Sequence, residues 1–576
     1  MIQRFFRPSM AIALSVAVVL VAVVVVFQGP PAQGRPTPVP VRAGEREVAW
    51  LYPATGAPSW QRFVEAVRRS AVRLQREGAE IAADDRNAFP SETTTVPEVA
   101  LSSGEGGSRF VFRWYKLTSD WKTNDWIEAL IQRQPPPLAI VGGSNSESAR
   151  ELATSLRRAA DSLPNAERPL LFLTTATADR VASSDEGERG SGESTSRPNV
   201  QLTQVYPQRT FRFCFSNGQM AAAVSNFIWS RDDLRPQRDP YYAATWRDDS
   251  YSRDFVEGFD SALRQVIARD STNLWAWASN QALLRSWPPF AGGIFPVQRL
   301  RGNPYFSQSA SDFRLDIPPN KLSIASSVGS FDTPNPYEAK AAGEMLDHWS
   351  AFPQNRPLLI LTGQSQPLRR FLRGVLRGVP SLSKRVEFVV ATGDAISFNT
   401  VYRDRRDAWN ILDLPFSLVF FCHRDPISPE AGFRAEGQRI DGDEQNNTAE
   451  TGTEDVLLFG DIVEALMQSA APADSPPCAH AEELAERLHE VRWRDGRTVR
   501  DGESAPLFDR EGQRRGGTGE HVVCLKPMWD TNYPDRLLPR ATIEVWAWPR
   551  VKGRQGERGQ RWLRRGEPLT VSYNDP

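Results

Sequence analysis

"PLAIVGGSNSESARELA" (residues 137–153) is the stretch that indicates the fold most directly. An apolar run ends in two glycines and several hydroxyl residues, and the apolar spacing then becomes that of an amphipathic helix. A strand that is apolar throughout and leads straight into a helix is typical of parallel sheets covered on both faces. Residues 142–146 at the junction are therefore either a tight turn with a helix cap or part of a binding site.

The same strand–helix alternation recurs along most of the chain, for example in "VAWLY", "PLLFLTT", "YYAATW", "PLLILTG" and "FSLVFFC" with the helical stretches that follow or separate them. Seven or more such units exceed one comfortable sheet, so the sequence predicts an α/β protein with two doubly wound parallel-sheet lobes. The expected division is 46–212 for the first part of lobe 1 and 213–392 for the first part of lobe 2. Residues 393–505 are expected to return to lobe 1, and residues 506–576 to lobe 2.

The N-terminus predicts export. Residues 10–27 are an apolar run that just reaches the length needed to cross a bilayer, and Arg4 and Arg7 in residues 1–9 would hold that end in the cytoplasm. The Pro-rich stretch 28–45 would be an extended linker. A cleaved signal peptide is the alternative to an anchor. In both cases the bulk of the chain is expected to be extracytoplasmic, either periplasmic or at the cell surface.

Composition excludes several classes of function. The formal net charge is −1, so no overall field favours nucleic acid. The sequence contains no HExxH motif, no phosphate-binding loop and no paired spacing of metal ligands. We therefore expect no metal and no cofactor. The four cysteines, Cys214, Cys422, Cys478 and Cys524, are too far apart for a CxxC signature. The sequence does not decide whether they form disulfides or are buried thiols.

The stretches resemble one known family when they are taken in order. "PLAIVGGSNSESARELA" with "PLLFLTTATAD", then "RTFRFCFSNGQMAAAVSNFI", "YYAATWRDDSYSRDFVEGF" and "PLFDREGQRR" are similar to the type I periplasmic solute-binding proteins, the branched-chain amino-acid receptor group of ABC transporters. The resemblance spans residues 46–576 and implies two lobes, joined by three crossings, that enclose a ligand. The chain departs from the family in its longer segment 271–322, and it has no lipid-attachment cysteine after the apolar run.

The resemblance also implies where a ligand would bind. By position, Ser144 and Ser146 match the family's turn that holds the ligand carboxylate, and Asn145 between them supplies an amide. Thr175 matches a second contact, with Thr177 close by, at the end of a strand where open α/β sheets place ligands. The purely structural alternative is that Ser144 caps the following helix while Glu147 reaches back to it, which is the S-x-x-E capping box.

Three further residues are candidates for the ligand site. Tyr251 opens a predicted helix of lobe 2, and its ring could close over a ligand. Asp394 follows a predicted strand and could pair with a ligand ammonium. Trp60, near the turn "PATGAPSW", could form an aromatic wall. Packing at a helix start explains Tyr251 as well, and a cap on the following segment explains Asp394 better than a ligand does. Trp60 is one of 17 tryptophans, so its position near a turn is weak support for a site.

The sequence therefore predicts a binding protein and not an enzyme. We expect a membrane-anchored protein that encloses an amino acid or a related amide or carboxylate for uptake or sensing, with a transporter permease or signalling protein as partner. A scaffold or sensory ectodomain that has lost its pocket is the alternative. A hydrolase using Ser365 in "LILTGQSQP", with His423 or His521 as base, is a remote one, since Pro367 replaces the second glycine of the nucleophile elbow.

Overall fold

The structure is a computed structural model of the 576-residue chain. It describes residues 36–92, 94–104, 108–182, 199–236, 242–246, 249–269, 314–317, 334–350, 356–379, 387–398, 401, 415–428, 454–471, 477–494, 497–499, 504–533, 536–548 and 562–572. The expected membrane anchor at 10–27 lies outside these ranges. Among the helices in them, none combines the length and the apolar character that a membrane span requires.

The first lobe is built on a seven-stranded sheet, in which parallel pairing joins five neighbouring strands and two antiparallel strands extend one edge. In spatial order the strands are β2 (Ile81–Asp84), β3 (Glu98–Ser103), β4 (Arg109–Leu117), β1 (Glu45–Pro53), β5 (Ala139–Gly142), β6 (Leu170–Leu173) and β9 (Thr210–Arg212). The chain builds outward in both directions from β1. The junction "GGSN" therefore lies beside the point where the strand order reverses, which is where open α/β sheets bind ligands.

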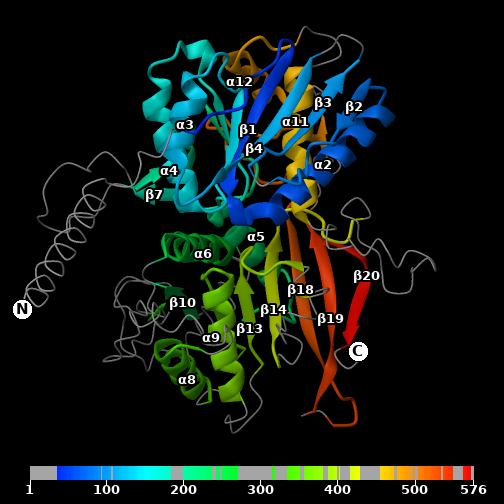
Figure 1. Cartoon of the computed structure of the whole chain (residues 1–576). Coiled ribbons are helices and arrows are strands. Elements are labelled where there is room, and N and C mark those ends of the chain that lie inside the picture. The colour runs from blue at the N-terminus through cyan, green and yellow to red at the C-terminus, as the bar shows by residue number, and fades with distance from the viewer. Residues whose placement is uncertain are drawn as a thin grey trace, which may run out of the picture.

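Helices cover both faces of this sheet because its central strands are apolar on both sides. In β1, Val48 and Trp50 face one core, while Ala49 and Leu51 face another. On the first face lie α2 (Ala57–Arg76), α11 (Glu454–Ala470) and α12 (Ala481–Glu490). On the second face lie α3 (Thr123–Gln132) and α4 (Ser146–Ala160). Figure 1 shows these two layers around β1 and β4.

The second lobe is built on an eight-stranded sheet. In spatial order its strands are β11 (Arg314–Ile317), β10 (Tyr242–Trp246), β12 (Leu358–Leu361), β13 (Val389–Thr392), β14 (Ser417–Cys422), β18 (His521–Trp529), β19 (Leu537–Ala547) and β20 (Leu563–Ser572). The first five are parallel and the last three are antiparallel. One face packs on α8 (Pro336–Ser350) and α9 (Ser365–Gly378), and the other packs on α5 (Asn217–Trp229) and α6 (Ser250–Arg269).

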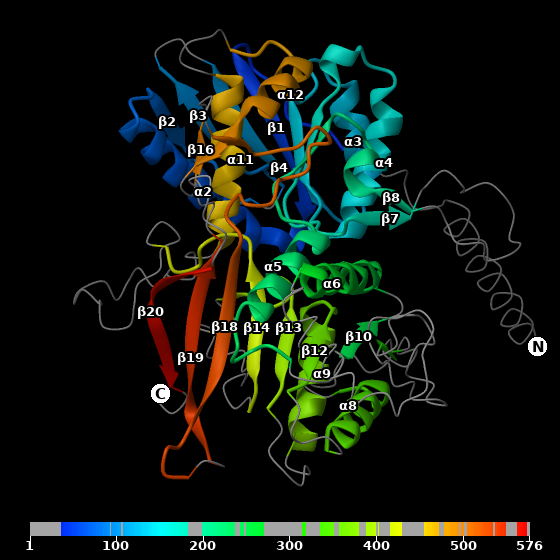
Figure 2. The same cartoon turned by 180° about the vertical axis from the view of Figure 1, so that it is seen from behind.

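The two-lobed α/β architecture predicted from the sequence is therefore present, with the lobes stacked so that the carboxyl ends of β1 and of β13 and β14 face each other (Figures 1 and 2). The second boundary differs from the expected one at 392. Because β14 pairs with β13 and β18, residues 417–422 belong to lobe 2, and the second crossing follows Cys422. The sequence could not show this, because β13 and β14 are both apolar strands and nothing in their pattern tells which of them is the last before the crossing.

Short elements complete the described fold. A three-stranded sheet is formed by β15 (Arg492–Arg494), β16 (Arg497–Val499) and β17 (Ala505–Pro506), and a two-stranded one by β7 (Arg180–Ala182) and β8 (Asn199–Gln201). Single 3-10 turns are η1 (Ala54–Gly56), η2 (Asn165–Glu167) and η3 (Leu202–Gln204). The four cysteines are all buried and free.

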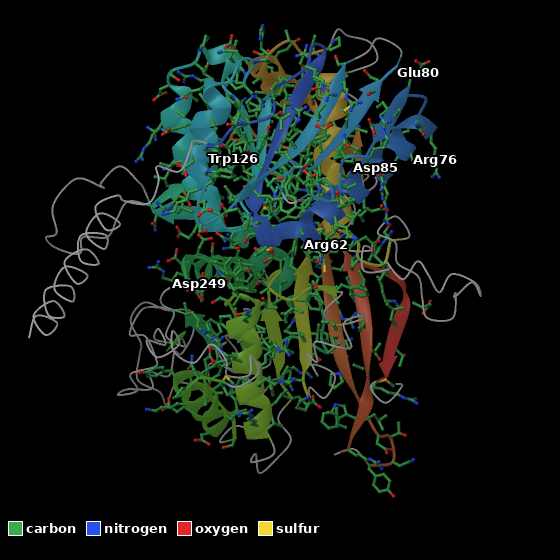
Figure 3. All side chains as sticks on the ribbon, viewed as in Figure 1. Arg62, Arg76, Glu80, Asp85, Trp126 and Asp249 are labelled. Carbon is green, nitrogen blue, oxygen red and sulfur yellow. The ribbon has the colours of Figure 1, made fainter. Side chains whose placement is uncertain are left out.

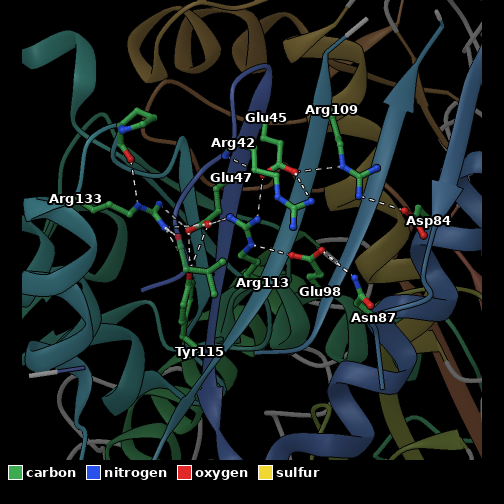
Figure 4. A network of polar contacts seen from close by, with 12 residues as sticks. Arg42, Glu45, Glu47, Asp84, Asn87, Glu98, Arg109, Arg113, Tyr115 and Arg133 are labelled. Atoms are coloured by element: carbon green, nitrogen blue, oxygen red, sulfur yellow. Dashed lines mark hydrogen bonds and ion pairs between the residues drawn. The ribbon is translucent and has the colours of Figure 1, made fainter. Parts of the chain in front are cut away.

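A buried ion network closes the end of the first sheet that points away from lobe 2 (Figure 4). The Glu47 carboxylate, fully buried, accepts hydrogen bonds from Arg113 at 2.6 Å, from Arg133 at 2.8 and 3.0 Å, and from Tyr115 at 3.2 Å. Arg133 also donates to the carbonyl of Val39 at 2.8 Å. The end of the expected linker 28–45 is thus fixed against lobe 1.

Candidate functional site

The glycines of the "GGSN" junction serve close packing. A Cβ on Gly142 would lie 2.5 Å from the Leu152 side chain, and one on Gly143 would lie 2.9 Å from Cβ of Ala149. Gly143 also has a φ of +78°, in the region that favours glycine. The two glycines therefore let α4 pack directly on the ends of its neighbouring strands, which is a sufficient reason for both.

The helix cap differs from the one expected. Asn145, not Ser144, is the N-cap residue: its side-chain oxygen accepts a hydrogen bond from the Ser148 backbone N–H at 2.8 Å. Ser148 returns the contact, since its hydroxyl accepts from the Asn145 N–H at 3.1 Å. The predicted Ser144–Glu147 capping box is wrong by one residue, and Glu147 is exposed and pairs with Arg150 instead.

The predicted hydroxyl residues of lobe 1 lie together but differ in exposure. Ser146 is buried, and its hydroxyl accepts from the Ala178 N–H at 3.1 Å. Thr177 is also buried. Thr175 is half-buried and donates to the Ser144 carbonyl at 3.1 Å, which joins the two strand-end turns. The hydroxyls of Ser144 and Thr175, with the exposed amide of Asn145, are therefore the predicted groups that remain partly accessible at this edge.

One residue at this edge was not predicted. Tyr52, near the end of β1, shares a hydrogen bond with the hydroxyl of Thr174, and both side chains are buried. Burial is the main cause that raises the Tyr52 pKa, to about 12, so the phenol stays protonated. Its position in "WLYPAT", at the end of a predicted strand, was the available signal.

In lobe 2 the structure brings two predicted residues into contact. Tyr251 donates its hydroxyl proton to Oδ1 of Asp394 at 3.0 Å. His423, just after β14, places Nε2 at 3.0 Å from Oδ2 of the same carboxylate. The other ring nitrogen, Nδ1, accepts from the Phe215 N–H at 3.2 Å, so in this arrangement the proton of the neutral ring is on Nε2 and is donated to Asp394. The Asp394 side chain remains 21% exposed.

The first crossing connects this carboxylate to lobe 1. The Cys214 thiol lies 3.5 Å from the carbonyl of Ala176, in the loop that carries Thr175. Burial raises the Cys214 pKa to about 12, and the charge of Asp394 contributes to that rise. Asp394 is linked to the first crossing through His423, which bonds both the Asp394 carboxylate and the Phe215 N–H.

A second carboxyl at the interface, that of Glu454, lies at the start of α11. Glu454 contacts the Cys422 thiol and the His423 backbone N–H, and its Oε2 atom is buried without a hydrogen-bond partner. Burial chiefly, and then the charges of Asp455 and Asp394, raise the Glu454 pKa to about 8. The interface between the lobes therefore carries more acidic groups than the sequence analysis identified.

Trp60 is not at this interface. It is 1% exposed, its ring packs on Trp50, Phe63 and Trp114, and its N–H donates to the Ala88 carbonyl at 2.9 Å. The proposed aromatic wall is wrong, because the apolar stripe of α2 turns this residue into the core.

The groups considered for hydrolysis are engaged elsewhere. Ser365 is the exposed first residue of α9. His423 bonds Asp394 and Phe215, as described, and Nδ1 of His521 lies 2.8 Å from the Gly519 carbonyl. Within the described residues, no group of three or more His, Cys, Asp or Glu could hold a metal ion.

Buried charges hold the three crossings together. Asp461 of α11 accepts from Arg424 at 2.8 and 2.9 Å and from Arg514 at 3.0 Å. Arg514 also donates to the Phe213 carbonyl at 2.8 Å. The second and third crossings therefore meet at the Asp461 carboxylate, and Arg514 links the first crossing to them. Arg62 and Asp249, labelled in Figure 3, lie at the level where the lobes meet.

No protein-family model matches the chain, and no curated protein is significantly similar in sequence. Among solved structures, an ABC transporter substrate-binding protein from Desulfitobacterium hafniense in complex with Leu has 13% identity and a TM-score of 0.43, and covers 86% of this chain and 100% of its own. A leucine-binding protein from Thermotoga maritima has 12% identity and a TM-score of 0.42, with 91% and 98% covered.

The structure is similar to those of type I periplasmic solute-binding proteins. The resemblance noted in the sequence is to the same group. A solute-binding protein of an ABC transporter from Rhodopseudomonas palustris, in complex with 3,4-dihydroxybenzoic acid, also matches, with 10% identity, 85% and 94% covered and a TM-score of 0.41. At these identities and scores the likeness says nothing of a shared ligand, and the fold described above rests on the two sheets themselves.

Proposed function

We propose that the chain is an extracytoplasmic binding protein that holds a small polar ligand between its two lobes. The observation that carries this is the Asp394 carboxylate, which is partly exposed at the interface end of β13 and points at no cation among the described residues. Both of its partners, Tyr251 and His423, are neutral donors. A carboxylate that is oriented but not neutralised is a suitable partner for a ligand ammonium.

The other end of the ligand would face lobe 1. Ser144 and Thr175 supply hydroxyls there, and the nearby start of α4 carries the positive end of a helix dipole, which favours a carboxylate or amide oxygen. An ammonium at one end and an oxygen at the other describe an amino acid or a related amide. Closure would be favoured only by the contacts that the ligand adds in the closed state.

The setting follows from the N-terminal sequence. Residues 10–27 would anchor the chain in a membrane, and the ligand would then be passed to a transporter permease or reported to a signalling partner. The two-lobed shape with a hinge of three crossings suits either role.

The test is a thermal-shift screen of the full chain, purified in a mild detergent, against amino acids, amides and small organic acids. We expect a specific rise in Tm with an amino acid or amide that Asp394→Asn and Thr175→Ala each abolish. The matched control is Glu387→Gln, an exposed carboxylate next to the opposite end of the same strand, β13, which should retain the shift.

A second candidate, a scaffold that binds no ligand, is favoured by one observation. Several predicted contacts are already made within the chain, since Ser146 bonds Ala178 and Tyr251 bonds Asp394. The absence of any shift across a broad panel would support this candidate and contradict the binding protein.

A further inference from the structure

Direct hydrogen bonds join the two lobes beside the first crossing, and they are made without a ligand. Asp254, in the first turns of α6 in lobe 2, accepts from the Asp179 N–H at 2.8 Å and from the Arg180 N–H at 3.2 Å, both in lobe 1. A side chain of one lobe thus binds two consecutive backbone donors of the other.

The exchange is reciprocal. The Asp179 carboxylate of lobe 1 accepts from the Gly218 N–H at 2.7 Å, in the first turn of α5 in lobe 2. A Cβ at Gly218 would lie 2.9 Å from that carboxylate oxygen, so the glycine permits the approach. The backbone N–H of Asn217 adds a bond to the Thr177 carbonyl of lobe 1 at 2.7 Å. The positive end of the α5 dipole is thereby occupied by a carboxylate of the chain itself.

The packing around the exchange is close on the lobe 2 side. The Asn217 side chain donates to Asp254 at 2.8 Å, which joins the starts of α5 and α6. A Cβ on Gly258 would be 3.2 Å from Cα of Gly218, so the two helices are in near backbone contact. Asp254 is therefore held by lobe 2 in the position from which it reaches lobe 1.

We propose that this exchange is a latch that keeps the lobes closed without a ligand, and that its pair of carboxylates makes its strength depend on pH. The latch lies next to the first crossing, so it would restrict opening from the hinge side. It does not depend on whether Asp394 binds a ligand.

The sign of the pH dependence follows from the environment of Asp254. Burial is the main cause that raises its pKa, to about 6, with the Asp179 charge second. Opening the lobes would expose the carboxyl to water and return its pKa towards about 4. The closed state then binds the proton more tightly. Closure gains stability as the pH falls through about 6 and loses that gain as the pH rises above it.

Other charged groups near the latch are few. Beside Asp179, they are the exposed Arg253 and Glu257 on α6, Arg180 at the start of β7, and the buried Arg212. The Arg212 guanidinium donates to the Thr177 and Ala178 carbonyls at 3.1 and 2.9 Å. On α4, which lies over α6 in Figure 1, Glu147 and Arg150 pair with each other. The groups that donate to Asp254 are the backbone N–H groups of Asp179 and Arg180 and the side-chain amide of Asn217. Among the described residues, no cation pairs with Asp254.

Hydrogen exchange of the full chain in detergent, without added ligand, tests the latch through its own amides. We expect the N–H groups of Asp179, Arg180 and Gly218 to be protected. After correction for the intrinsic rate, their protection should be up to about tenfold higher at pH 5 than at pH 7.5. Asp254→Ala should lower it at least tenfold and remove the pH dependence, while the amides of β12 stay unchanged.

The matched control is Glu257→Ala, an exposed carboxylate one turn further along the same helix, which should leave the protection intact. Exchange of the three wild-type amides at the intrinsic rate would overturn the proposal, and so would an equal loss of protection in Glu257→Ala. Should Asp254→Ala fail to fold, the pH dependence of the wild-type amides decides alone, and a flat profile contradicts the proposal.

Discussion

The carboxylates at the outer end of lobe 1 and those at the interface between the lobes differ in their partners. At the outer end, Glu47 is surrounded by Arg113, Arg133 and Tyr115, so the charge is fully paired. At the interface between the lobes, Asp461 is also paired with arginines, but neither Asp254 of lobe 2 nor Glu454 of α11 has a cationic partner within the described part of the chain. The pKa of Asp254 is raised to about 6 and that of Glu454 to about 8.

The difference separates a rigid region from one that can respond. A buried ion network with every charge paired is costly to disturb, because removing one partner leaves another charge unpaired in a poor solvent. Carboxyls that are shielded from water and held by uncharged donors alone change their charge near neutral pH, so they respond to protons, to lobe movement or to a cation. The outer end thus supports the fold, and the inner end is suited to function.

The largest effect is expected from breaking the outer network. Arg113→Ala would leave Glu45, Glu47 and Glu98 with fewer partners, and it should lower the free energy of unfolding by about 3–5 kcal/mol. Urea denaturation at pH 7 measures this change. Arg86→Ala, which removes an exposed partner of Asp84, should have no measurable effect. Similar losses in both variants would show that the network does not stabilise the fold.

A smaller, pH-dependent effect is expected at the interface. The raised pKa of Glu454, about 8, means that its contribution to stability is present below its ordinary pKa and is lost as the pH rises through 8. Glu454→Gln removes the ionisation, so its stability relative to wild type should be about 1–2 kcal/mol greater at pH 6 than at pH 4.5, and the difference should keep growing until about pH 8. Denaturation curves at the two pH values decide, and equal differences at both would contradict the raised pKa.

The smallest effect is expected at an uncharged position of the same interface. Asn145→Ala should cost about 1 kcal/mol, because it removes the acceptor for the first turn of α4. Ser144→Ala and Glu147→Ala should each cost less, although the sequence alone pointed to them. A larger loss in Ser144→Ala than in Asn145→Ala would place the cap where the sequence analysis expected it.

These contrasts show what the sequence could reveal. Continuous apolar strands followed by polar turns predicted two lobes and located residues 142–146 and 174–177 at strand ends, because that pattern is local. The contact between Tyr251 and Asp394 joins the start of α6 to the loop after β13. The sequence pattern points to Tyr251 as a helix start and to Asp394 as the residue after a strand.

What the sequence could not reveal depends on distant parts of the chain. The local sequence does not show whether Trp60 packs in the core or lines a ligand site, because a tryptophan in the first turn of this helix could do either. His423 was one of two possible bases in the remote hydrolase alternative, and only the fold places it on Asp394. The partners of Glu47 are 66 and 86 residues away, so charged residues in an apolar strand could not be recognised as a network.

The core of lobe 1 has a consequence for biosynthesis. It combines β1 and α2 with α11 and α12, and Ser70 of α2 donates to Glu464 of α11, 394 residues later. At a translation rate of about 5–20 residues per second, roughly 20–80 s separate the emergence of these two helices from the ribosome. During that interval the apolar face of the nascent first lobe is uncovered, while lobe 2 is synthesised in between. Such a chain would depend on a holding chaperone until α11 arrives.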